Sequence, residues 1–373
     1  MSRHKRLSLP RSKRGAGAAL VGLSLVLVAC GQASAPAASS PASAPGSPAS
    51  APASSQASPK ASQPAASARS ASAAPKPSTL GEVRVALASP NYTPWAPLFY
   101  AKENGFFDKL GVQVTTTPYN GGGPMQQALA SGSADVIQFP PFGMIPAVNK
   151  GVKEHIVAVN QPYANGWYIL VKKDSPIKAL ADLNGKKIGI SGTGSATEIY
   201  ARWALGQGHA QGQLVPLGPQ GIIPNLIAGH VDAGIGTPPQ SFQADADGLR
   251  ILVDLGTQMP AVVQDSVVAS DSIISAHPAA VRAYLEGLFQ GIVYMKKHPD
   301  EAVQFMVKYT KQPQALEQQE YQNEILKLSD DGTINPAWID NALKLAGQAG
   351  IKDLPPAKTL YDPQFTPVKV AAP

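Results

Sequence analysis

Cysteine is almost missing from this 373-residue sequence, in which Cys30 carries the one thiol. No disulfide can therefore form within the chain. Histidine is sparse too, and the five histidines beyond the N-terminal region lack the close spacing of metal ligands: positions 155, 209, 230, 277 and 298. We expect no metal site, and no cysteine chemistry beyond position 30.

Nucleotide-binding motifs are absent or incomplete. No P-loop Gly-Lys-Ser/Thr sequence occurs. Gly192 and Gly194 follow an expected strand as in a dinucleotide fingerprint, but Thr197 stands where the third glycine belongs. No acidic residue lies between Glu198 and Asp232, so the acid that would bind a ribose about 20 residues further on is missing. We expect no cofactor and no catalysis.

The N-terminal region has the form of an export signal. Six Lys and Arg residues precede a short apolar run at 16–29, which is shorter than the roughly 20 residues of a membrane span. The run ends in Leu27-Val28-Ala29-Cys30, which resembles the lipobox of bacterial lipoproteins, where the cysteine receives diacylglycerol. We expect residues 1–29 to be a lipoprotein signal peptide and Cys30 the lipidated residue. The alternative is an ordinary cleaved signal with an incidental cysteine.

Removal of this signal changes the charge of the protein. The formal net charge of the whole chain is +6, with 31 Lys and Arg against 25 Asp and Glu. Six of the basic residues and none of the acidic ones lie in residues 1–29, which leaves 25 against 25. The basic pI therefore belongs largely to the signal and does not indicate a nucleic-acid partner.

Residues 30–79 consist almost entirely of Ala, Ser and Pro after Cys30. Such a composition offers few side chains for a core, and its prolines interrupt helices. We expect a disordered tether, which at about 3 Å per residue would reach about 100 Å or more from the membrane.

A doubled stretch organises the remaining residues, 80–373. Residues 129–141 and 226–239 both have a Leu three positions before a Gly, an Asp three positions after it, a short apolar run and a Pro-Pro pair. Gly132 and Gly229 favour the left-handed conformation that ends a helix, and the prolines end the following strand. The 97-residue separation of the two glycines predicts two similar α/β lobes rather than a solenoid.

Strands and helices alternate through this region, which predicts two mostly parallel sheets covered by helices. We expect strands near 83–88, 112–119, 187–190, 214–217, 249–255 and 262–270. Apolar residues at helical spacing in 278–298 predict a helix that packs on the core. Helices near 300–310 and 313–328 and then a Pro-rich tail complete the chain.

Three phrases in this region resemble the SsuA/THI5-like (NMT1-like) substrate-binding proteins, a family that includes nitrate, sulfonate, taurine and thiamine-precursor receptors of ABC importers. These are Pro97–Phe107, Asn120–Asp135 and the Leu180-Ala-Asp-Leu-Asn-Gly-Lys-Lys-Ile-Gly-Ile190 segment. The resemblance implies a type II periplasmic-binding-protein fold, with two α/β lobes joined by hinge crossovers and the ligand cleft between them. The fold is shared by a THI5-type pyrimidine synthase, but that enzyme carries a cysteine-rich motif which this chain lacks.

We expect lobe 1 to comprise about 80–174 plus 265–373, and lobe 2 about 175–264, with crossovers near 170–176 and 262–266. Ligands bind beyond the carboxyl ends of strands in open α/β sheets, which selects loops at 89–95, 139–142, 161–167, 191–198 and 237–240. Aromatic side chains in these loops can enclose a small solute or simply pack on their own lobe. The candidate ligand-binding residues are Asn91, Tyr92, Trp95, Phe139, Pro140, Gln161, Trp167, Gly192, Thr193, Gly194, Ser195, Thr197, Glu198, Thr237 and Pro238.

The turn at 191–198 joins a strand to a helix, so backbone N–H groups and the positive end of the helix dipole should point into the cleft. The resemblance implies that this turn holds an anion. Ser195 and Glu198, however, also fit a capping box, and a carboxylate here would repel an anion. Glu198 therefore has two interpretations: it caps the helix, or it binds a cationic or amine-bearing ligand.

These observations predict an extracytoplasmic, lipid-anchored component of an ABC importer at the bacterial cell membrane. It would capture a small organic solute or anion by hinge closure and deliver it to a permease with its ATPase. We expect a monomer. The alternative is a ligand-sensing ectodomain or adaptor that reports to a membrane partner without transport.

Overall fold

The computed structural model describes residues 80–259 and 261–371. The expected signal peptide, the lipidation at Cys30 and the tether lie outside the described residues. The described part contains two five-stranded sheets, each built from its own set of strands.

The first sheet is built mainly from the beginning of the described region. Its strands are β1 (Glu82–Leu87), β2 (Gln113–Pro118), β3 (Val136–Phe139), β4 (Glu154–Gln161) and β10 (Asp265–Ser270), in the order β2-β1-β3-β10-β4. β1 pairs in parallel with β2 and β3, whereas β10 runs antiparallel to both β3 and β4. Four strands therefore share one direction and β10 opposes them.

The second sheet repeats this arrangement. Its strands are β5 (Tyr168–Lys172), β6 (Lys187–Ile190), β7 (Gln213–Pro216), β8 (Ala233–Gly236) and β9 (Leu249–Asp254), in the order β7-β6-β8-β5-β9. β6 pairs in parallel with β7 and β8, and β5 runs antiparallel to β8 and β9. The expectation of two mostly parallel sheets is confirmed, with one reversed strand in each.

Each reversed strand is the first strand after the chain crosses between the sheets. The crossing into the second lobe is residues 162–167, and the return is residues 255–264. The predicted boundary at 174 and the crossover at 170–176 are therefore wrong, because β5 pairs within the second sheet. The apolar run at 167–172 lies on the first-lobe side of the predicted boundary, but it forms the first strand after the crossing.

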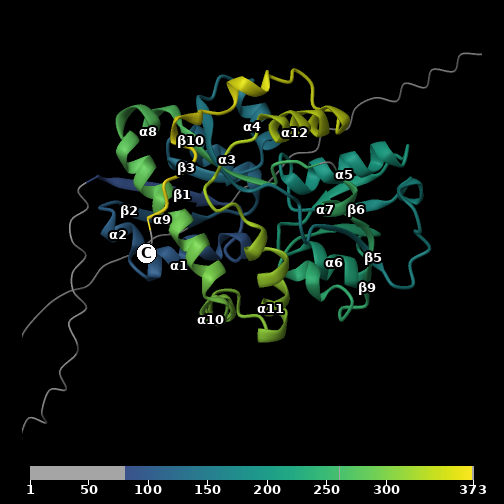
Figure 1. Ribbon diagram of the computed structural model, residues 1–373. Coiled ribbons are helices and arrows are strands. Elements are labelled where there is room, and N and C mark those ends of the chain that lie inside the picture. Colours follow the sequence, from purple (N-terminus) through teal and green to yellow (C-terminus); the bar gives the residue numbers. More distant parts are fainter. Residues whose placement is uncertain (1–79, 260, 372–373) are drawn as a thin grey trace, which may run out of the picture. The chain divides into compact units, whose positions relative to one another are not determined.

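Helices cover the faces of both sheets, as Figure 1 shows. The first lobe has α1 (Ala96–Glu103), α2 (Phe106–Lys109), α3 (Gly122–Ala130), α4 (Pro141–Val148), α8 (Asp271–Ala276), α9 (Pro278–Lys297), α10 (Pro299–Thr310) and α11 (Gln314–Asn323). The second has α5 (Ala196–Gln207), α6 (Ile222–Ala228) and α7 (Leu255–Gln258). The 3-10 turns are η1 (Thr93–Trp95), η2 (Leu180–Leu183), η3 (Gln240–Gln243), η4 (Ile325–Lys327), η5 (Ala357–Thr359) and η6 (Pro363–Phe365).

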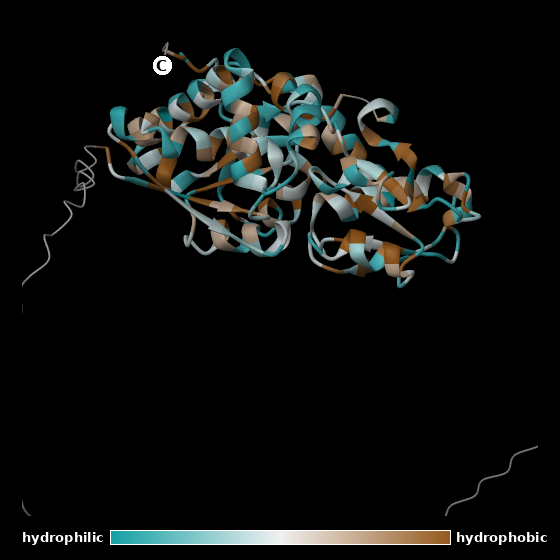
Figure 2. Ribbon diagram, turned by 90° about the horizontal axis from the view of Figure 1, so that it is seen from below, coloured by the Kyte–Doolittle hydropathy of each residue, from teal (hydrophilic) through white to brown (hydrophobic). Residues whose placement is uncertain are grey.

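The apolar stripe predicted for 278–298 lies on α9 and is buried. Val281, Leu285, Leu288, Phe289, Ile292 and Met295 are each exposed by 1% or less. The side chains of α9 pack against α1 and the first sheet, so this stripe belongs to the core. Figure 2 shows apolar residues gathered on the strands and on the helix faces that meet them. In the described part of the chain, no helix combines the length and apolar character needed to cross a membrane.

The doubled stretch occupies the same position in both lobes. α3 and α6 end just before Gly132 and Gly229, whose φ angles are 74° and 78°, and β3 and β8 follow. A side chain at such a φ would be strained, which explains the glycine in both copies. The paired prolines follow each strand, as the sequence predicted.

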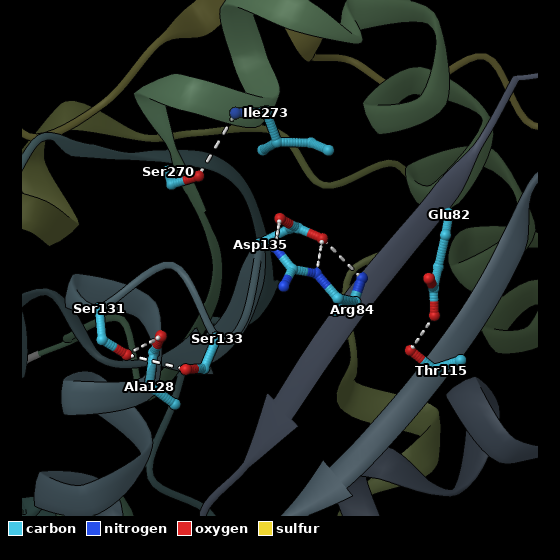
Figure 3. Close-up of polar contacts among 9 residues, drawn as sticks. All are labelled: Glu82, Arg84, Thr115, Ala128, Ser131, Ser133, Asp135, Ser270 and Ile273. Carbon is cyan, nitrogen blue, oxygen red and sulfur yellow. Dashed lines mark hydrogen bonds and ion pairs between the residues drawn. The ribbon is translucent and has the colours of Figure 1, made fainter.

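The aspartate of each copy also has an equivalent partner. The Asp135 carboxylate accepts hydrogen bonds from the backbone N–H of Arg84 at 2.9 Å and from its guanidinium at 2.6 Å (Figure 3). In the second lobe, Asp232 accepts the backbone N–H of Lys187 at 2.8 Å. Each aspartate therefore fixes the strand after the helix to a parallel neighbour in its own sheet, β3 to β1 and β8 to β6.

The expected Pro-rich tail instead contains a thirteen-residue helix, α12 (Pro336–Gln348). Asn335 caps it by accepting the N–H of Ala337 at 3.0 Å, and Pro336 occupies its first turn. These are ordinary helix-start signals. α12 packs on α4 of the first lobe and on α5 of the second, between which it lies in Figure 1. The C-terminal region therefore belongs to both lobes.

Candidate functional site

A cleft lies where the carboxyl ends of the strands of both lobes meet. It encloses about 690 Å³ of empty space when counted out to its open mouth. Its walls come from loops that follow β1, β3, β6 and β8 and from the residues that precede the reversed strands β5 and β10. Because a reversed strand begins at the edge where its parallel neighbours end, both crossings contribute side chains to the cleft.

Three aromatic side chains form one wall of the cleft. Tyr92 stands edge-on to Trp95, with ring centroids 5.1 Å apart, and edge-on to Trp167 at 6.1 Å. The Trp167 indole N–H donates to the Tyr92 hydroxyl at 3.0 Å, and that hydroxyl donates to the Gln161 side chain at 3.0 Å. The three rings are less than 10% exposed. This wall is therefore a fixed apolar surface suited to a ring or a short hydrocarbon chain.

Phe139 lies at the base of the cleft, where two glycines make room for its ring. A Cβ atom at Gly122 would lie 2.5 Å from the Phe139 ring, and one at Gly143 would lie 2.2 Å from it. The sequence places Phe139 directly before the Pro-Pro pair, at the end of β3. Its position thus depends on the glycines at the start of α3 and within α4.

The turn before α5 forms the opposite wall. Ser195 caps the helix, because its hydroxyl accepts the N–H of Glu198 at 3.3 Å. The Thr197 hydroxyl accepts the N–H of Ser191 at 2.8 Å and contacts the Ser195 hydroxyl at 2.7 Å. The first N–H groups of α5 have no intrahelical carbonyl, and Ser195, Ala196 and Thr197 all line the cleft. The positive end of the α5 dipole therefore faces the empty space.

Glu198 is turned away from the cleft. One carboxylate oxygen accepts the N–H of Gly194 at 2.6 Å, and the other binds the guanidinium of Arg202 at 2.6 Å. Ser195 thus caps α5, whereas Glu198 accepts from Gly194 and not from Ser195, so the reciprocal capping box is incomplete. This geometry supports the capping interpretation of Glu198 over a contact with ligand.

Asp265 is the carboxyl group that the cleft does contain. It is 3% exposed, lines the cleft and begins β10. Its Oδ2 accepts the Trp95 indole N–H at 2.9 Å and lies 3.4 Å from the Asn160 side-chain amide. Burial raises the pKa of Asp265 to about 7, and these donors hold it lower than burial alone would.

Asp265 is not among the residues that the sequence predicted. The carboxyl-end rule points to residues after parallel strands, whereas Asp265 precedes a reversed one. The available signal was a single acidic residue flanked by the apolar runs at 262–263 and 267–269.

The remaining polar lining is uncharged. Gln138, Gln220, Gln240 and Gln264 contribute amides, and no Lys, Arg or His side chain is among the lining residues that the structure describes. Gln220 bridges the mouth, because it donates to Asn91 of the first lobe at 3.1 Å and accepts from Gln240 at 2.7 Å. The amide of Gln264 accepts a hydrogen bond from the buried hydroxyl of Tyr200.

The predicted residues fall into two groups. Those that line the cleft are Tyr92, Trp95, Phe139, Pro140, Trp167, Ser195, Thr197, Thr237 and Pro238. Those that do not line it are Asn91, Gln161, Gly192, Thr193, Gly194 and Glu198. Asn91 lies at the mouth, and Gln161 lies behind Tyr92, where its amide donates to Glu324 at 2.8 Å.

Three buried glutamates lie behind the aromatic wall, near the start and end of α11. Glu317, Glu320 and Glu324 are each exposed by 1% or less, and burial raises the pKa of all three, that of Glu320 to about 8. Thr310 donates to Glu317 and Thr93 to Glu320. In the part of the chain with described positions, no group of His, Cys, Asp and Glu side chains could hold a metal ion. Burial therefore favours the neutral form of these glutamates.

Two similar α/β lobes with an enclosed cleft between them define a solute-binding protein. The chain belongs to the NMT1/THI5-like family, whose model matches residues 92–302. That span contains the second sheet, both crossings and every strand of the first sheet except β1, and it holds all of the cleft lining except Ala88 and Ser89.

Relatives and solved structures agree with this assignment. A protein provisionally named as a binding protein in Brucella abortus is 26% identical over 253 residues, which cover 64% of this chain and 77% of that one. A protein of Brachyspira hyodysenteriae, provisionally named as an ABC transporter periplasmic binding protein, is 26% identical over 58% of this chain and 66% of its own length. The alkanesulfonate-binding protein of Xanthomonas axonopodis, solved with MOPS bound, has the same fold, with a TM-score of 0.65, 17% identity and coverage of 76% and 98%.

Proposed function

We propose that this chain is the extracytoplasmic solute-binding component of an ABC importer and that it closes on a small organic solute. The observation that carries the proposal is a single cleft lined from both lobes, with an aromatic wall on one side and a helix N-terminus on the other. A relative of similar length that is provisionally named as an ABC transporter binding protein supports the importer assignment.

Closure follows from the way in which the two lobes meet at the mouth. A Cβ atom at Gly123 of the first lobe would lie 2.7 Å from the Thr193 carbonyl oxygen of the second, and one at Gly121 would lie 3.8 Å from the Ser191 oxygen. The lobes therefore approach to backbone contact around the cleft. A ligand that touches both walls binds the closed form better than the open form, and this difference in affinity drives closure.

The lining favours binding over turnover. The cleft holds hydroxyls, amides and one carboxyl group, and none of its described lining residues is a His, Cys or Lys that would act as a base or nucleophile. The hydroxyls of Ser195 and Thr197 are already engaged in the cap of α5. We therefore propose a receptor that is not an enzyme.

The importer assignment includes the lipid anchor at Cys30 and delivery to a permease with its ATPase. Incorporation of a labelled fatty acid into the chain, and its loss in Cys30→Ala, tests the anchor. Retention of the label in Cys30→Ala would contradict it.

The central experiment is small-angle scattering of the purified chain with and without the small molecule that co-purifies with it, identified by native mass spectrometry. We expect ligand removal to increase the radius of gyration. An unchanged scattering profile would contradict hinge closure, and turnover of the molecule would contradict the receptor assignment. If deletion of a permease encoded beside this chain stops growth on the solute, transport is established. Normal growth after the deletion would favour a sensor.

A further inference from the structure

Among the described residues that line the cleft, Asp265 is the one with an acidic side chain. Glu198 is the other acid in the surrounding loops, but Gly194 and Arg202 occupy its carboxylate. No basic residue is among the described residues that line the cleft. A ligand in this cleft therefore meets a carboxyl group with no basic side chain beside it, and the N-terminus of α5 is the positive end on the other wall.

The carboxyl group of Asp265 is incompletely satisfied by the protein. A carboxylate offers about four lone-pair positions. Trp95 and Asn160 both approach Oδ2, at 2.9 and 3.4 Å, and the backbone N–H of Ser266 supplies a further donor. At least one acceptor position is left for a group in the cleft.

The surroundings of this acceptor are aromatic. Trp95, which donates to Asp265, is edge-on to Tyr92, which is in turn edge-on to Trp167. A ligand that contacts Trp95 therefore lies near Asp265. Burying a carboxylate that has too few hydrogen-bond donors costs free energy. A donor on the ligand would offset part of this cost.

We propose that the ligand is a small ring-bearing solute with an N–H donor, an amine or an amide, and that Asp265 accepts this donor and discriminates against anions. This inference rests on the proposed function and specifies the ligand of the same cleft. Asp265 is thus the residue that determines specificity, a role that the sequence suggested for Glu198.

The pH dependence distinguishes the two kinds of donor. The pKa of Asp265 is raised to about 7 by burial, so an ammonium group that binds the ionised carboxylate would bind more weakly below pH 7. The groups that face Asp265 are Trp95 from η1 and Asn160 from β4, and Tyr92 and Tyr200 lie nearby; burial raises the pKa of both tyrosines, so they stay neutral. An amide ligand should show little change over the same range.

The test uses three probes with the same ring: benzylamine, benzamide and benzenesulfonate. Their affinities for the full chain are measured by ligand-observed NMR at pH 6 and pH 8, after the co-purified molecule has been removed. We expect benzylamine or benzamide to bind at least about 10-fold more tightly than benzenesulfonate, and Asp265→Asn to remove this preference, since one charge-assisted hydrogen bond contributes about 1.5–3 kcal/mol.

Asp254→Asn is the matched control, because it makes the same chemical change at the cap of α7 and outside the cleft lining. Equal binding of the three probes, a preference for benzenesulfonate, or no binding by any of them would overturn the proposal. A preference for benzenesulfonate would contradict only the ligand class and would leave the proposed solute-binding function intact. Absence of closure with the co-purified molecule would contradict the proposed function itself. If Asp265→Asn does not fold, Trp95→Phe is the second test, because it removes a donor that lowers the pKa of Asp265 and should weaken benzylamine binding relative to benzenesulfonate at pH 8; an unchanged ratio would overturn the proposal.

Discussion

Asp135 in the first lobe and Asp232 in the second form the same link between two strands. Asp135 accepts the backbone N–H of Arg84 at 2.9 Å and donates its own N–H to the Arg84 carbonyl at 2.8 Å. Asp232 and Lys187 repeat both contacts, each at 2.8 Å. The doubled stretch is therefore a structural unit that joins a helix, a glycine turn and a strand to a parallel neighbouring strand, β1 in the first lobe and β6 in the second.

This link predicts a loss of stability in Asp135→Ala. The substitution leaves the Arg84 N–H without its charged acceptor, which costs about 1.5–3 kcal/mol. The ion pair itself should matter less, because the Arg84 side chain is 43% exposed and such pairs contribute at most about 1 kcal/mol. Urea denaturation of Asp135→Ala and Arg84→Gln measures both terms. If Arg84→Gln lowered the free energy of unfolding more than Asp135→Ala does, the ion pair would matter more than the backbone hydrogen bond, contrary to this prediction.

Gly123→Ala should obstruct closure without weakening the fold. The new Cβ would lie 2.7 Å from the carbonyl oxygen of Thr193 across the mouth, a separation that requires the two lobes to move apart. Gly123 lies in the first turn of α3, where Ala is the better helix former by about 1 kcal/mol. We expect affinity for the co-purified solute to fall about 10-fold or more while the unfolding midpoint is kept or raised. Calorimetric titration and thermal denaturation provide the two readouts.

Gly192→Ala is the control for this prediction, because its Cβ would meet no atom within 4 Å. It lies in the facing turn and should leave both closure and affinity unchanged. Equal loss of affinity in the two variants would mean that the turns respond to any added side chain, and that contact across the mouth is not the cause.

Glu198→Gln should reduce stability and leave ligand affinity unchanged. The substitution removes the charge that Arg202 contacts at 2.6 Å and weakens the acceptor for the Gly194 N–H. Caps of this kind contribute about 1 kcal/mol. A fall in affinity with no loss of stability would restore a ligand-binding role for Glu198. Arg202→Gln is the companion variant, since it breaks the ion pair but keeps the cap.

The sequence predicted the two lobes and most of the cleft because these depend on local signals. Glycine turns, strand ends and the Pro-Pro pairs lie at fixed positions in each copy, so the loops that follow parallel strands could be identified. Asp265 could not be identified in this way, because it reaches the same edge at the start of a reversed strand, and only the pairing of β10 reveals that direction.

The other differences have the same origin. The boundary at 174 was wrong because an apolar run does not show which sheet it joins. The helix at 336–348 was not predicted, although Asn335 and Pro336 mark its start, because the prolines of the tail are typical of irregular structure. Its contacts with α4 and α5 depend on the arrangement of the lobes and have no local signal.

Asn341→Ala should loosen the return crossing. Asn341 on α12 donates to the Ala261 carbonyl at 2.8 Å, in the segment through which the chain re-enters the first lobe. Losing this hydrogen bond should cost about 1 kcal/mol and shift the balance between open and closed forms. Scattering of the ligand-free variant should show a change in the radius of gyration. An unchanged profile with reduced stability would limit α12 to a packing role.

Stability should fall as the pH rises from about 4.5 to 8 because of the glutamates on α11. Burial raises the pKa of Glu320 from 4.5 to about 8, so the folded protein keeps this proton over a range in which the unfolded chain loses it. The folded state then binds more protons than the unfolded one, and the free energy of unfolding decreases with rising pH until the folded pKa is passed.

Glu320→Gln removes this titration and keeps an acceptor for Thr93. The variant should therefore be more stable than the original chain at pH 8, by up to roughly 4 kcal/mol, and about equally stable at pH 4. Glu103→Gln on the exposed end of α1 is the control, since Glu103 is solvent-exposed and pairs only with the exposed Lys308. Urea denaturation at pH 4, 6 and 8 gives the free energy of unfolding of the original chain and of each variant. A gain in stability that is the same at all three pH values would show that the side-chain amide packs better than the acid, and that proton uptake by Glu320 is not the cause.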